Sequence, residues 1–279
     1  MPGTLFVVST PIGNLEDITL RALRVLREAA VIAAEDTRRT RGLLTHFDIR
    51  TPLLSLHEHN ERARVPALLA RLQAGEAVAL VTDAGTPLVS DPGATLVEQA
   101  REIGIRVEAI PGPSAVLAAL VSSGLSADSF TFAGFVPAKA SARTSWLDAI
   151  AAEPRPVVFF EAPHRIRATL AELLSTVGDR RVAIARELTK VHEEVVTGPL
   201  STALDALHSP RGEFTIVLSP AADEPVPDVS DDRLWDEFRS LTARDGLSRR
   251  EAIAALARRY HRPARAVYAA LERARVDPT

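Results

Sequence analysis

The sequence predicts an α/β protein with two α/β domains, the first built on a mostly parallel sheet and the second on a mixed sheet, followed by a small C-terminal helical domain. Short apolar runs alternate with helical periods in the first half of the chain. Closely spaced apolar runs follow near residues 182–197, and a stretch with three prolines and four acids, 220–231, precedes three helical patterns. We therefore expect domains at residues 1–115, 116–222 and 231–279.

The first predicted sheet is made of apolar runs that follow one another at regular intervals. They are Leu5–Val8, Val31–Ala34, Leu53–Leu56, Ala77–Val81 and Val107–Ile110. Helical stretches such as Arg62–Leu72 and Ala94–Ile103 separate them. Continuous apolar strands that alternate with helices are typical of a parallel sheet covered on both faces.

The rhythm changes after residue 111. A Pro-Gly-Pro loop leads into an apolar helix at Ala115–Val121, and a polar stretch spans Pro137–Ser145. Further strands are expected at Val157–Phe160, Val182–Ala185, Val195–Thr197 and Phe214–Leu218. The short distance between the second and third of these strands predicts antiparallel pairing.

Three helical patterns complete the chain, at Leu234–Leu241, Arg249–Arg259 and Ala264–Ala274. Ser248 with Glu251 three residues later predicts a capping box, and Pro263 suits the first turn of the last helix. Two helices separated by a short turn resemble a helix-turn-helix. A plain helical cap that packs on the main body is the alternative.

The charge balance bears on the partner. The chain has 279 residues with 33 basic and 36 acidic side chains, and its net charge of −3 argues at first against a nucleic-acid partner. Residues 244–276, however, hold nine arginines against three acids. These arginines either dock on RNA phosphates or pair with the acidic body.

Composition also excludes several classes of site. Cysteine is absent, which excludes disulfides, thiolate metal ligands and a cysteine nucleophile. The chain shows neither a signal peptide nor an apolar run long enough to span a membrane, so we expect a cytoplasmic protein without membrane contact.

The strongest local signal is the loop Thr82–Gly93, which follows one predicted strand and precedes a helix. It contains two glycines, two prolines and two aspartates, more than a turn needs. Loops at the carboxyl edge of a parallel sheet bind ligands, and Asp83 is a ready acceptor for a ligand hydroxyl or ammonium. The alternative is a turn that only caps the next helix.

Two other loops after strands share this character, at residues 9–14 and 110–115. Loops after strands of one parallel sheet open at the same edge, so the three can form one pocket. Neither the dinucleotide fingerprint nor the phosphate-binding P-loop motif is present. A compact ligand with an adenine, a ribose and an amino-acid end suits such a pocket.

Charged loops also follow strands in the second domain, at residues 159–165 and 185–194. Glu187 and His192 are possible proton acceptors, while Arg186 and Lys190 are cations that suit phosphate. A solvated hairpin with surface ion pairs is the alternative for the second loop.

Two polar segments of the first domain, Glu35–Arg41 and Ser55–Glu61, follow strands as well. The arginines of the first segment suit a nucleic-acid backbone. His57 and His59 lack a clear third ligand, so we expect no metal site.

Together these motifs resemble the ribosomal RNA small subunit methyltransferase I family, within the tetrapyrrole methylase superfamily of class III S-adenosylmethionine-dependent methyltransferases. The resemblance covers almost the whole chain. The matching segments, in chain order, are TPIGNL, EDTRRT, LHEHNE, DAGTP, IPGPS, EAPHR, RELTKVHEE and GEF. Serine, threonine and proline at positions 9–11 depart from the Gly-x-Gly-Pro-Gly type of loop in the tetrapyrrole enzymes and fit the RNA-directed branch.

The resemblance implies 2′-O-methylation of a cytidine in 16S rRNA, the decoding-centre cytidine 1402, within the 30S subunit. It also implies a homodimer and a cleft between the two α/β domains that holds S-adenosylmethionine. The residues implied to face this cofactor are Thr10, Pro11, Asp83, Gly85, Thr86, Ser114, Ala115, Phe160, Ala185 and Arg186. The alternatives are a methylase of a tetrapyrrole precursor and a ribosome-binding factor without catalysis.

Methyl transfer to a ribose hydroxyl calls for a base or a cation near the oxygen. We expect Glu187, Lys190 and His192 in this role, with Arg186 as a further cation and Glu35 and Asp36 as rival bases. Residues expected to surround the cleft and contact RNA are Arg38, Arg39, Arg41, His57, His59 and Arg165.

Overall fold

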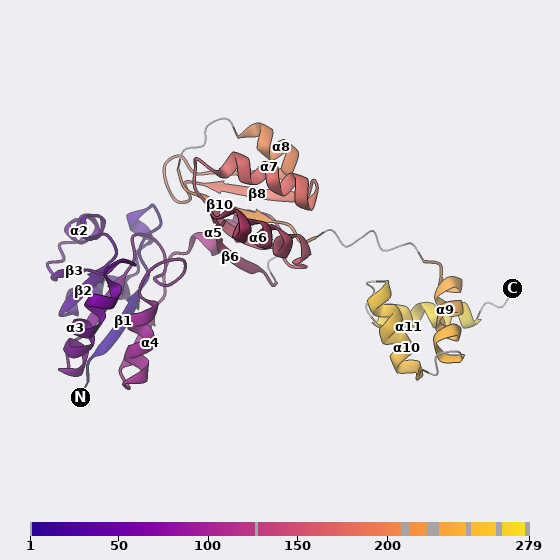
Figure 1. Cartoon of the computed structure of the whole chain (residues 1–279), viewed down its shortest axis with the longest axis horizontal. Coiled ribbons are helices and arrows are strands. Elements are labelled where there is room, and N and C mark those ends of the chain that lie inside the picture. The colour runs from indigo at the N-terminus through magenta and orange to yellow at the C-terminus, as the bar shows by residue number, and fades with distance from the viewer. Residues whose placement is uncertain are drawn as a thin grey trace. The chain divides into compact units, whose positions relative to one another are not determined.

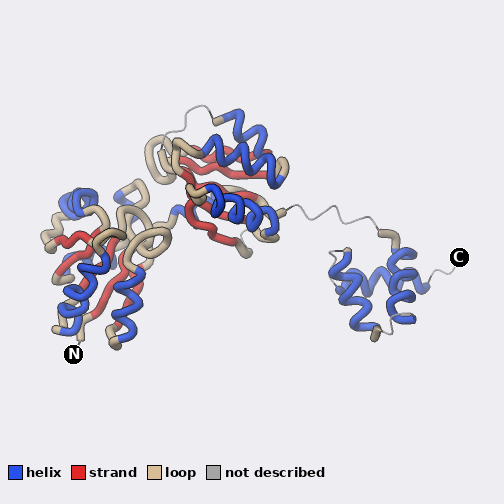
Figure 2. The backbone as a smooth tube through the Cα atoms, in the orientation of Figure 1, coloured by secondary structure: helices blue, strands red, loops and turns tan. Residues whose placement is uncertain are grey.

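A computed structural model describes residues 2–125, 128–207, 212–221, 229–243, 247–260 and 264–276 (Figure 1). The chain divides into two compact units, Met1–Ser219 and Pro220–Thr279. The first unit contains two sheets with helices, and the second consists of helices (Figure 2). The α/β class and the additional helical domain are confirmed.

The first sheet has the strand order β3-β2-β4-β1-β5, and all its neighbouring strands are parallel. Its strands are β1 (Thr4–Val8), β2 (Val31–Ala34), β3 (Leu53–Ser55), β4 (Val78–Val81) and β5 (Arg106–Ile110). Each lies within one residue of the apolar run that predicts it. The prediction of a parallel first sheet is therefore confirmed.

Helices cover both faces of this sheet because successive strand residues point to opposite sides. Ile32 and Ala34 pack in a core with α1 (Leu20–Glu28) and α2 (Thr37–His46). Val31 and Ala33 pack in a second core with α3 (Glu61–Gln73) and α4 (Ala94–Glu102). The short helix η1 (Leu15–Asp17) precedes α1.

The second sheet has the order β6-β7-β10-β8-β9 and is mixed. β10 is antiparallel to β7 and β8, β8 is antiparallel to β9, and β6 is parallel to β7. Its strands are β6 (Thr131–Phe135), β7 (Val157–Glu161), β8 (Arg181–Arg186), β9 (Glu194–Pro199) and β10 (Phe214–Leu218). The predicted antiparallel pairing of β8 with β9 is confirmed.

Two helical layers enclose the second sheet. Helix α5 (Ala115–Ser122) packs with Val158 and Ala185 on one face. Phe159 and Ile184 point to the other face, where three helices pack. These helices are α6 (Ala140–Ala152), α7 (Ile166–Val177) and α8 (Leu200–Ala206). Helix α6 occupies much of the stretch that the sequence presents as merely polar.

The second unit contains α9 (Asp231–Ala243), α10 (Arg249–Arg259) and α11 (Ala264–Val276), which confirms the three helical patterns. Leu234, Leu256 and Val267 are fully buried in a core of the unit's own. The capping box is confirmed, since the Ser248 amide donates to Glu251 Oε2 at 2.9 Å and the Glu251 amide donates to Ser248 Oγ at 3.4 Å. Pro263 and linker residues 222–228 lie outside the described residues.

We propose the domain boundaries 1–115, 116–222 and 231–279, because α5 packs on the second sheet and the last three helices share their own core. Within the described part of the chain, no helix is both long and apolar enough to cross a membrane.

Candidate active site

Three loops meet at the carboxyl edge of the first sheet, because β1 lies between β4 and β5. A backbone bridge joins two of them: the Thr10 amide donates to the Gly85 carbonyl at 2.8 Å, and the Gly85 amide donates to the Thr10 carbonyl at 3.1 Å. The Ser9 amide donates to the Ile110 carbonyl at 3.1 Å. Main-chain hydrogen bonds thus hold the loops after β1, β4 and β5 together.

A neighbouring network joins the loop after β4 to the loop after β2. The Thr82 hydroxyl donates to Glu35 Oε2 at 2.9 Å, and the Asp36 amide donates to Asp83 Oδ1 at 3.0 Å. Arg39 on α2 reaches Asp83 Oδ2 with a nitrogen–oxygen distance of 3.6 Å. The carboxylates are therefore fixed by backbone and hydroxyl donors at the edge where ligands of parallel sheets bind.

A cavity of about 700 Å³ opens at this edge and takes its walls from both sheets. This size is usual for a pocket that holds a small molecule. Six of the residues expected to face a cofactor line it: Asp83, Gly85, Thr86, Ser114, Ala115 and Phe160. Glu35 and Arg39 line it as well.

The other four residues expected to face a cofactor lie elsewhere. Thr10 and Pro11 line a second, smaller cavity of about 130 Å³, together with Arg39, Thr82 and Asp83. Ala185 is buried in the core beneath α5. Arg186 pairs with Glu194 at 3.0 Å. Thr10 thus positions the loop around Gly85 rather than lining the larger cavity.

Acidic side chains dominate the charge of the larger cavity. Its lining contains five carboxylates, Glu35, Asp83, Asp91, Glu161 and Glu213, and one basic residue, Arg39. Burial raises the pKa of Asp91 to about 6, and the nearby Glu35 and Asp83 carboxylates add to the rise. Burial also raises the pKa of Asp83. Such a lining favours a cationic ligand, because a positive charge relieves the repulsion among the carboxylates.

The expected catalytic residues lie in a loop beside the cavity. Lys190 Nζ lies 2.9 Å from Glu187 Oε1 and 3.4 Å from Glu213 Oε2, and Glu213 lines the cavity. The hydrogen bond from Lys190 lowers the pKa of Glu187 despite partial burial. Burial alone would lower the pKa of Lys190. The Glu187 and Glu213 carboxylates raise it by more than burial lowers it, so the pKa of Lys190 lies above its ordinary value. A carboxylate held in this way is a weaker base than a free one.

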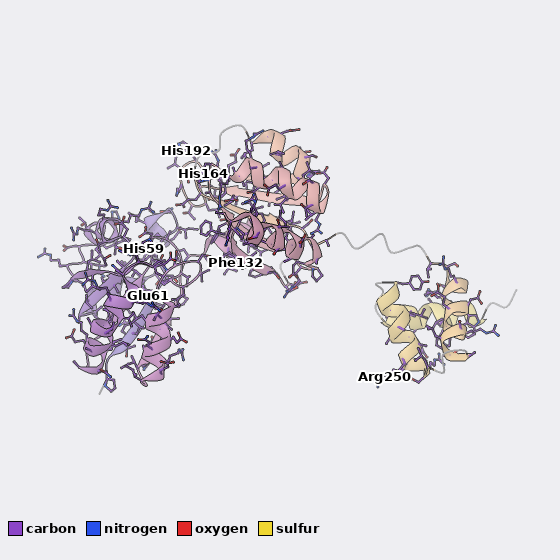
Figure 3. The ribbon with its side chains drawn as sticks, in the orientation of Figure 1. His59, Glu61, Phe132, His164, His192 and Arg250 are labelled. Carbon is purple, nitrogen blue, oxygen red and sulfur yellow. The ribbon has the colours of Figure 1, made fainter. Side chains whose placement is uncertain are left out.

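His192 lies in the same loop, and its side chain is exposed. Figure 3 labels it with His164 on the part of the molecule that carries the second sheet. Neither His192 nor Glu187 belongs to the lining of the larger cavity, whereas the adjacent Leu188 does.

The loop after β1 approaches this catalytic loop closely at Gly13. A Cβ atom added to Gly13 would lie 2.5 Å from Lys190 Cγ and 2.9 Å from the Leu188 carbonyl oxygen. A side chain therefore has no room at position 13. The absence of one lets the loops of the two sheets touch.

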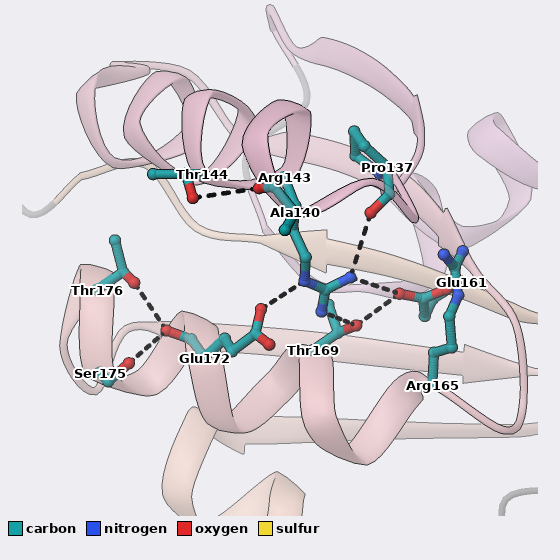
Figure 4. A network of polar contacts seen from close by, with 10 residues as sticks. All are labelled: Pro137, Ala140, Arg143, Thr144, Glu161, Arg165, Thr169, Glu172, Ser175 and Thr176. Carbon is teal, nitrogen blue, oxygen red and sulfur yellow. Dashed lines mark hydrogen bonds and ion pairs between the residues drawn. The ribbon is translucent and has the colours of Figure 1, made fainter.

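The Glu161 carboxylate ends β7 and is buried in a polar network (Figure 4). Arg165 lies 2.7 Å from Glu161 Oε1, and the Thr169 hydroxyl donates to Oε2 at 2.5 Å. Arg143 on α6 donates to Thr169 Oγ1 at 2.8 Å and lies 4.0 Å from Glu161 Oε2. Arg165, which we expect to contact RNA, is thus engaged by a buried acid at the cavity wall.

The other residues expected to contact RNA come from the first sheet. Arg38 and Arg41 lie exposed on α2, and Arg38 pairs with Asp36 at 2.8 Å. Hydrogen bonds from Arg38 lower the pKa of Asp36 to about 2. The rings of His57 and His59 lie 6.0 Å apart, and His59 is exposed beside α3 (Figure 3). No cluster of three or more potential metal ligands occurs among the residues that the structure describes.

Several lining residues escaped the sequence prediction of the site, among them Asp91, Phe135, Glu161 and Glu213. Asp91 belongs to the predicted loop Thr82–Gly93, and Glu161 and Glu213 belong to segments that carry the resemblance. Phe135 had no comparable signal, since it ends an unpredicted strand.

The comparisons with known proteins agree with this arrangement. Residues 4–204 match the family described as Tetrapyrrole (Corrin/Porphyrin) Methylases. A Synechocystis sp. protein named Ribosomal RNA small subunit methyltransferase I is 48% identical over 269 residues, 95% of this chain and 96% of that protein. The Pseudomonas aeruginosa protein of the same name is 52% identical over 222 residues, 78% of this chain and 79% of that protein.

Solved structures show the same fold at lower identity. The crystal structure of the methyltransferase CobJ has a TM-score of 0.60 and 20% identity, and the match covers 79% of this chain and 95% of that one. The crystal structure of the uroporphyrin-III C-methyltransferase from Thermus thermophilus complexed with S-adenyl homocysteine has a TM-score of 0.56 and 21% identity. This match covers 78% of this chain and 97% of that one. The chain therefore belongs to the tetrapyrrole methylase family and, within it, to the ribosomal RNA small subunit methyltransferase I family.

Proposed function

We propose that this protein methylates the 2′-oxygen of a cytidine ribose in 16S rRNA, with S-adenosylmethionine as methyl donor. Cytidine 1402 is the target that the family resemblance implies. The observation that carries the proposal is the acid-lined cavity at the carboxyl edge of the first sheet. Family membership supports the reaction class, and relatives along most of the chain bear the name of an rRNA methyltransferase.

The cavity suits this cofactor in charge and in size. S-adenosylmethionine, when bound, supplies a methyl group on a positively charged sulfur. Asp91 and Glu35 offer carboxylates toward a cation, and Asp83 adds a carboxylate whose backbone donor fixes its direction. The volume of about 700 Å³ is within the range of pockets that enclose ligands of this class.

For the acceptor hydroxyl, we propose that a side chain of this protein takes the proton as the oxygen is methylated. Glu187 and His192 remain the candidate bases of the loop after β8, and Lys190 is the candidate cation that stabilises the reacting oxygen. Asp91 and Glu35 compete with them, since both line the cavity and the pKa of Asp91 is raised to about 6. Single-turnover methylation by Glu187→Gln, His192→Ala and Asp91→Asn distinguishes these bases. Replacing the residue that acts as the base should lower the single-turnover rate about 100-fold or more.

The RNA contacts that we propose follow the basic and polar side chains near the cavity. Arg38, Arg39 and Arg41 extend from α2, with His57 and His59 on a neighbouring loop. Arg165 fits less well, because Glu161 already engages it. We place the reaction in the cytoplasm, on rRNA within the 30S subunit.

A homodimer is part of the proposal. Leu117 and Val121 are four residues apart on α5, and they are 52% and 77% exposed. Large exposed apolar side chains on one helical face suit a contact between two copies. Light scattering should give the mass of a dimer for the wild type and of a monomer for Val121→Glu.

The decisive experiment maps methylated nucleotides by mass spectrometry in 16S rRNA from cells with and without this protein. Loss of one 2′-O-methylcytidine, restored by the wild-type gene, is the expected result. Transfer of labelled methyl to a tetrapyrrole precursor instead of 30S subunits would point to the small-molecule alternative. Failure of calorimetry to detect S-adenosylmethionine binding would point to a ribosome-binding factor without catalysis.

A further inference from the structure

Three phenylalanines gather at the wall of the larger cavity. The Phe160 ring lies 5.1 Å from the Phe132 ring and 5.2 Å from the Phe135 ring, measured between centroids. Phe135 and Phe160 line the cavity. Phe160 and Phe132 are partly buried, whereas Phe135 is 53% exposed. An exposed aromatic ring in a cavity wall is a surface on which a planar group can stack.

An irregularity of the edge strand β6 aims Phe135 at this position. In a regular strand, residues three apart point to opposite faces. The pairing of β6 with β7 shifts register between Phe132 and Phe135, and Gly134 has a φ of +65°. The shift brings both rings against Phe160. Bulges of this kind redirect side chains next to active sites.

The same bulge lies against the loop after β4. A Cβ added to Gly134 would lie 3.5 Å from Ser90 Oγ, and Ser90 itself has a φ of +68°. Ser90 and its neighbour Val89, which is 40% exposed, also line the cavity. Phe135 therefore stands beside a loop that carries the acidic Asp83 and Asp91, with part of its ring open to solvent.

We propose that Phe135 is the stacking platform for the base of the acceptor nucleotide, with its ring supported by Phe160, which packs in turn on Phe132. This inference rests on the proposed methylation of an RNA ribose. To bring a ribose hydroxyl to an enclosed site, the nucleotide leaves its stack, and its base then needs a new apolar partner. A half-exposed ring at the wall provides that partner for a ligand arriving from solvent. Every base has a π-face, so stacking contributes affinity without reading the sequence.

The test compares three substitutions at one position. Methylation kinetics use 30S subunits from cells that lack the protein, and calorimetry measures the affinity for S-adenosylmethionine. Phe135→Ala should lower kcat/KM for 30S subunits about 10- to 100-fold. Phe135→Leu, which keeps apolar volume but loses the ring, should be similarly poor, while Phe135→Tyr should restore activity to near the wild-type level. All three should bind S-adenosylmethionine within about twofold of the wild type, because stacking adds only to RNA affinity.

The matched control is Leu20→Ala, which removes an 86% exposed apolar side chain from α1, outside the cavity lining. It should change neither measurement. Full activity of Phe135→Leu would overturn the platform. The platform would also be overturned if Phe135→Ala lost as much affinity for S-adenosylmethionine as methylation activity, because the ring would then hold the adenine of the cofactor. A wild-type protein that binds S-adenosylmethionine and leaves 30S subunits unmethylated would instead contradict the proposed function.

Discussion

The backbone amide of Asp36 donates a hydrogen bond to the Asp83 carboxylate, with an N···Oδ1 distance of 3.0 Å. This bond joins the loops that follow β2 and β4, two adjacent strands of the first sheet. It orients a carboxylate whose other oxygen faces Arg39 at 3.6 Å. Asp83 is therefore both a structural link between loops and an acidic group of the cavity lining.

Replacing Asp83 with alanine should weaken the binding of S-adenosylmethionine by about 10-fold or more, because a charged hydrogen-bond partner is lost. Asp83→Asn keeps an acceptor for the Asp36 amide and should show a smaller loss. Isothermal titration calorimetry measures both. Asp48→Asn is the matched control, since Asp48 is exposed, pairs only loosely with Arg50 at 3.5 Å and lies outside the cavity lining. Unchanged affinity in Asp83→Ala would remove Asp83 from the site.

Asp91 should make cofactor binding depend on pH. Its pKa is raised from 3.8 to about 6 in the folded protein, chiefly by burial. As pH rises through 6, the carboxyl ionises and attracts a cationic ligand more strongly. The affinity for S-adenosylmethionine should therefore increase between pH 5 and 7 in the wild type by about 10-fold at most. Asp91→Asn should flatten this profile, and an identical slope in both proteins would contradict the assignment.

The same raised pKa should cost stability above pH 4. In the unfolded chain, Asp91 ionises with its ordinary pKa of 3.8, whereas in the folded protein it stays protonated until about pH 6. Between these two values, rising pH lowers the free energy of the unfolded state more than that of the folded state, so the free energy of unfolding falls. Asp91→Asn should raise the free energy of unfolding at pH 7 by about 1 kcal/mol, a value reduced for solvent screening. Urea titrations at pH 7 and below pH 4 check this, because the two proteins should converge at the lower pH.

Replacing Arg143 on α6 should lower the free energy of unfolding markedly, because this one side chain binds several partners. Its side chain is 14% exposed and binds Glu172 at 2.5 Å, besides Thr169 and the Glu161 carboxylate (Figure 4). Arg143→Met leaves a buried acid with fewer partners and should lower the free energy of unfolding by about 3 kcal/mol. Arg155→Met is the control. Arg155 pairs with Glu153 at 2.7 Å but is half exposed, so its loss should cost less than about 1 kcal/mol.

Charge reversal on α2 should separate RNA binding from cofactor binding. Arg38 and Arg41 are exposed, and neither lines the cavity, whereas Arg39 does. Arg38→Glu with Arg41→Glu should weaken 30S binding at low salt by about 10-fold or more and reduce its salt dependence. S-adenosylmethionine affinity should stay constant in this double variant. Arg50→Glu, a reversal at an 89% exposed side chain, controls for net charge, and equal losses there would dismiss a specific contact.

The C-terminal unit offers a separate test of RNA docking. Among its described arginines, Arg233, Arg249 and Arg273 form ion pairs within the unit, with Glu237, Glu272 and Asp231. Arg250 is exposed (Figure 3). Deleting residues 230–279 should reduce 30S affinity in a salt-dependent way while the melting temperature of the first unit stays constant. A fall in melting temperature without loss of RNA affinity would show that these helices only stabilise the body.

The first sheet was predictable from the sequence because its strands are buried on both faces. Val31–Ala34 and Val78–Val81 are apolar at every position, and helices of regular period separate such runs. The loop that carries Asp83 was predictable for the same reason, since the end of an apolar strand fixes where a ligand-binding loop begins.

The edge of the second sheet was not predictable in this way. β6 has the sequence TFAGF, and its glycine at the register shift breaks the alternation that signals a strand. Helix α6 has one fully buried side chain, Ile150, so it lacks an apolar stripe. Both elements form because tertiary contacts complete a pattern that local sequence leaves weak.

The network around Glu161 depends on contacts between distant parts of the chain. Arg143 precedes Glu161 by 18 residues, and their side chains meet because α6 packs in the same core as β7. The sequence shows an acid before Ala-Pro-His-Arg but not that the acid is fully buried. We expected Arg165 to contact RNA because the sequence shows its charge. The sequence does not show that its partner, Glu161, is buried and already pairs with it.

The backbone bridge between Thr10 and Gly85 separates how two loops are joined from which side chains face a ligand. Two main-chain hydrogen bonds make the bridge, and Gly85 also lines the larger cavity. Replacing the side chains of other lining residues leaves these amide and carbonyl groups in place. The cavity lining can therefore be redesigned for other ligands, at positions such as Phe135, without removing the hydrogen bonds that hold the two loops together.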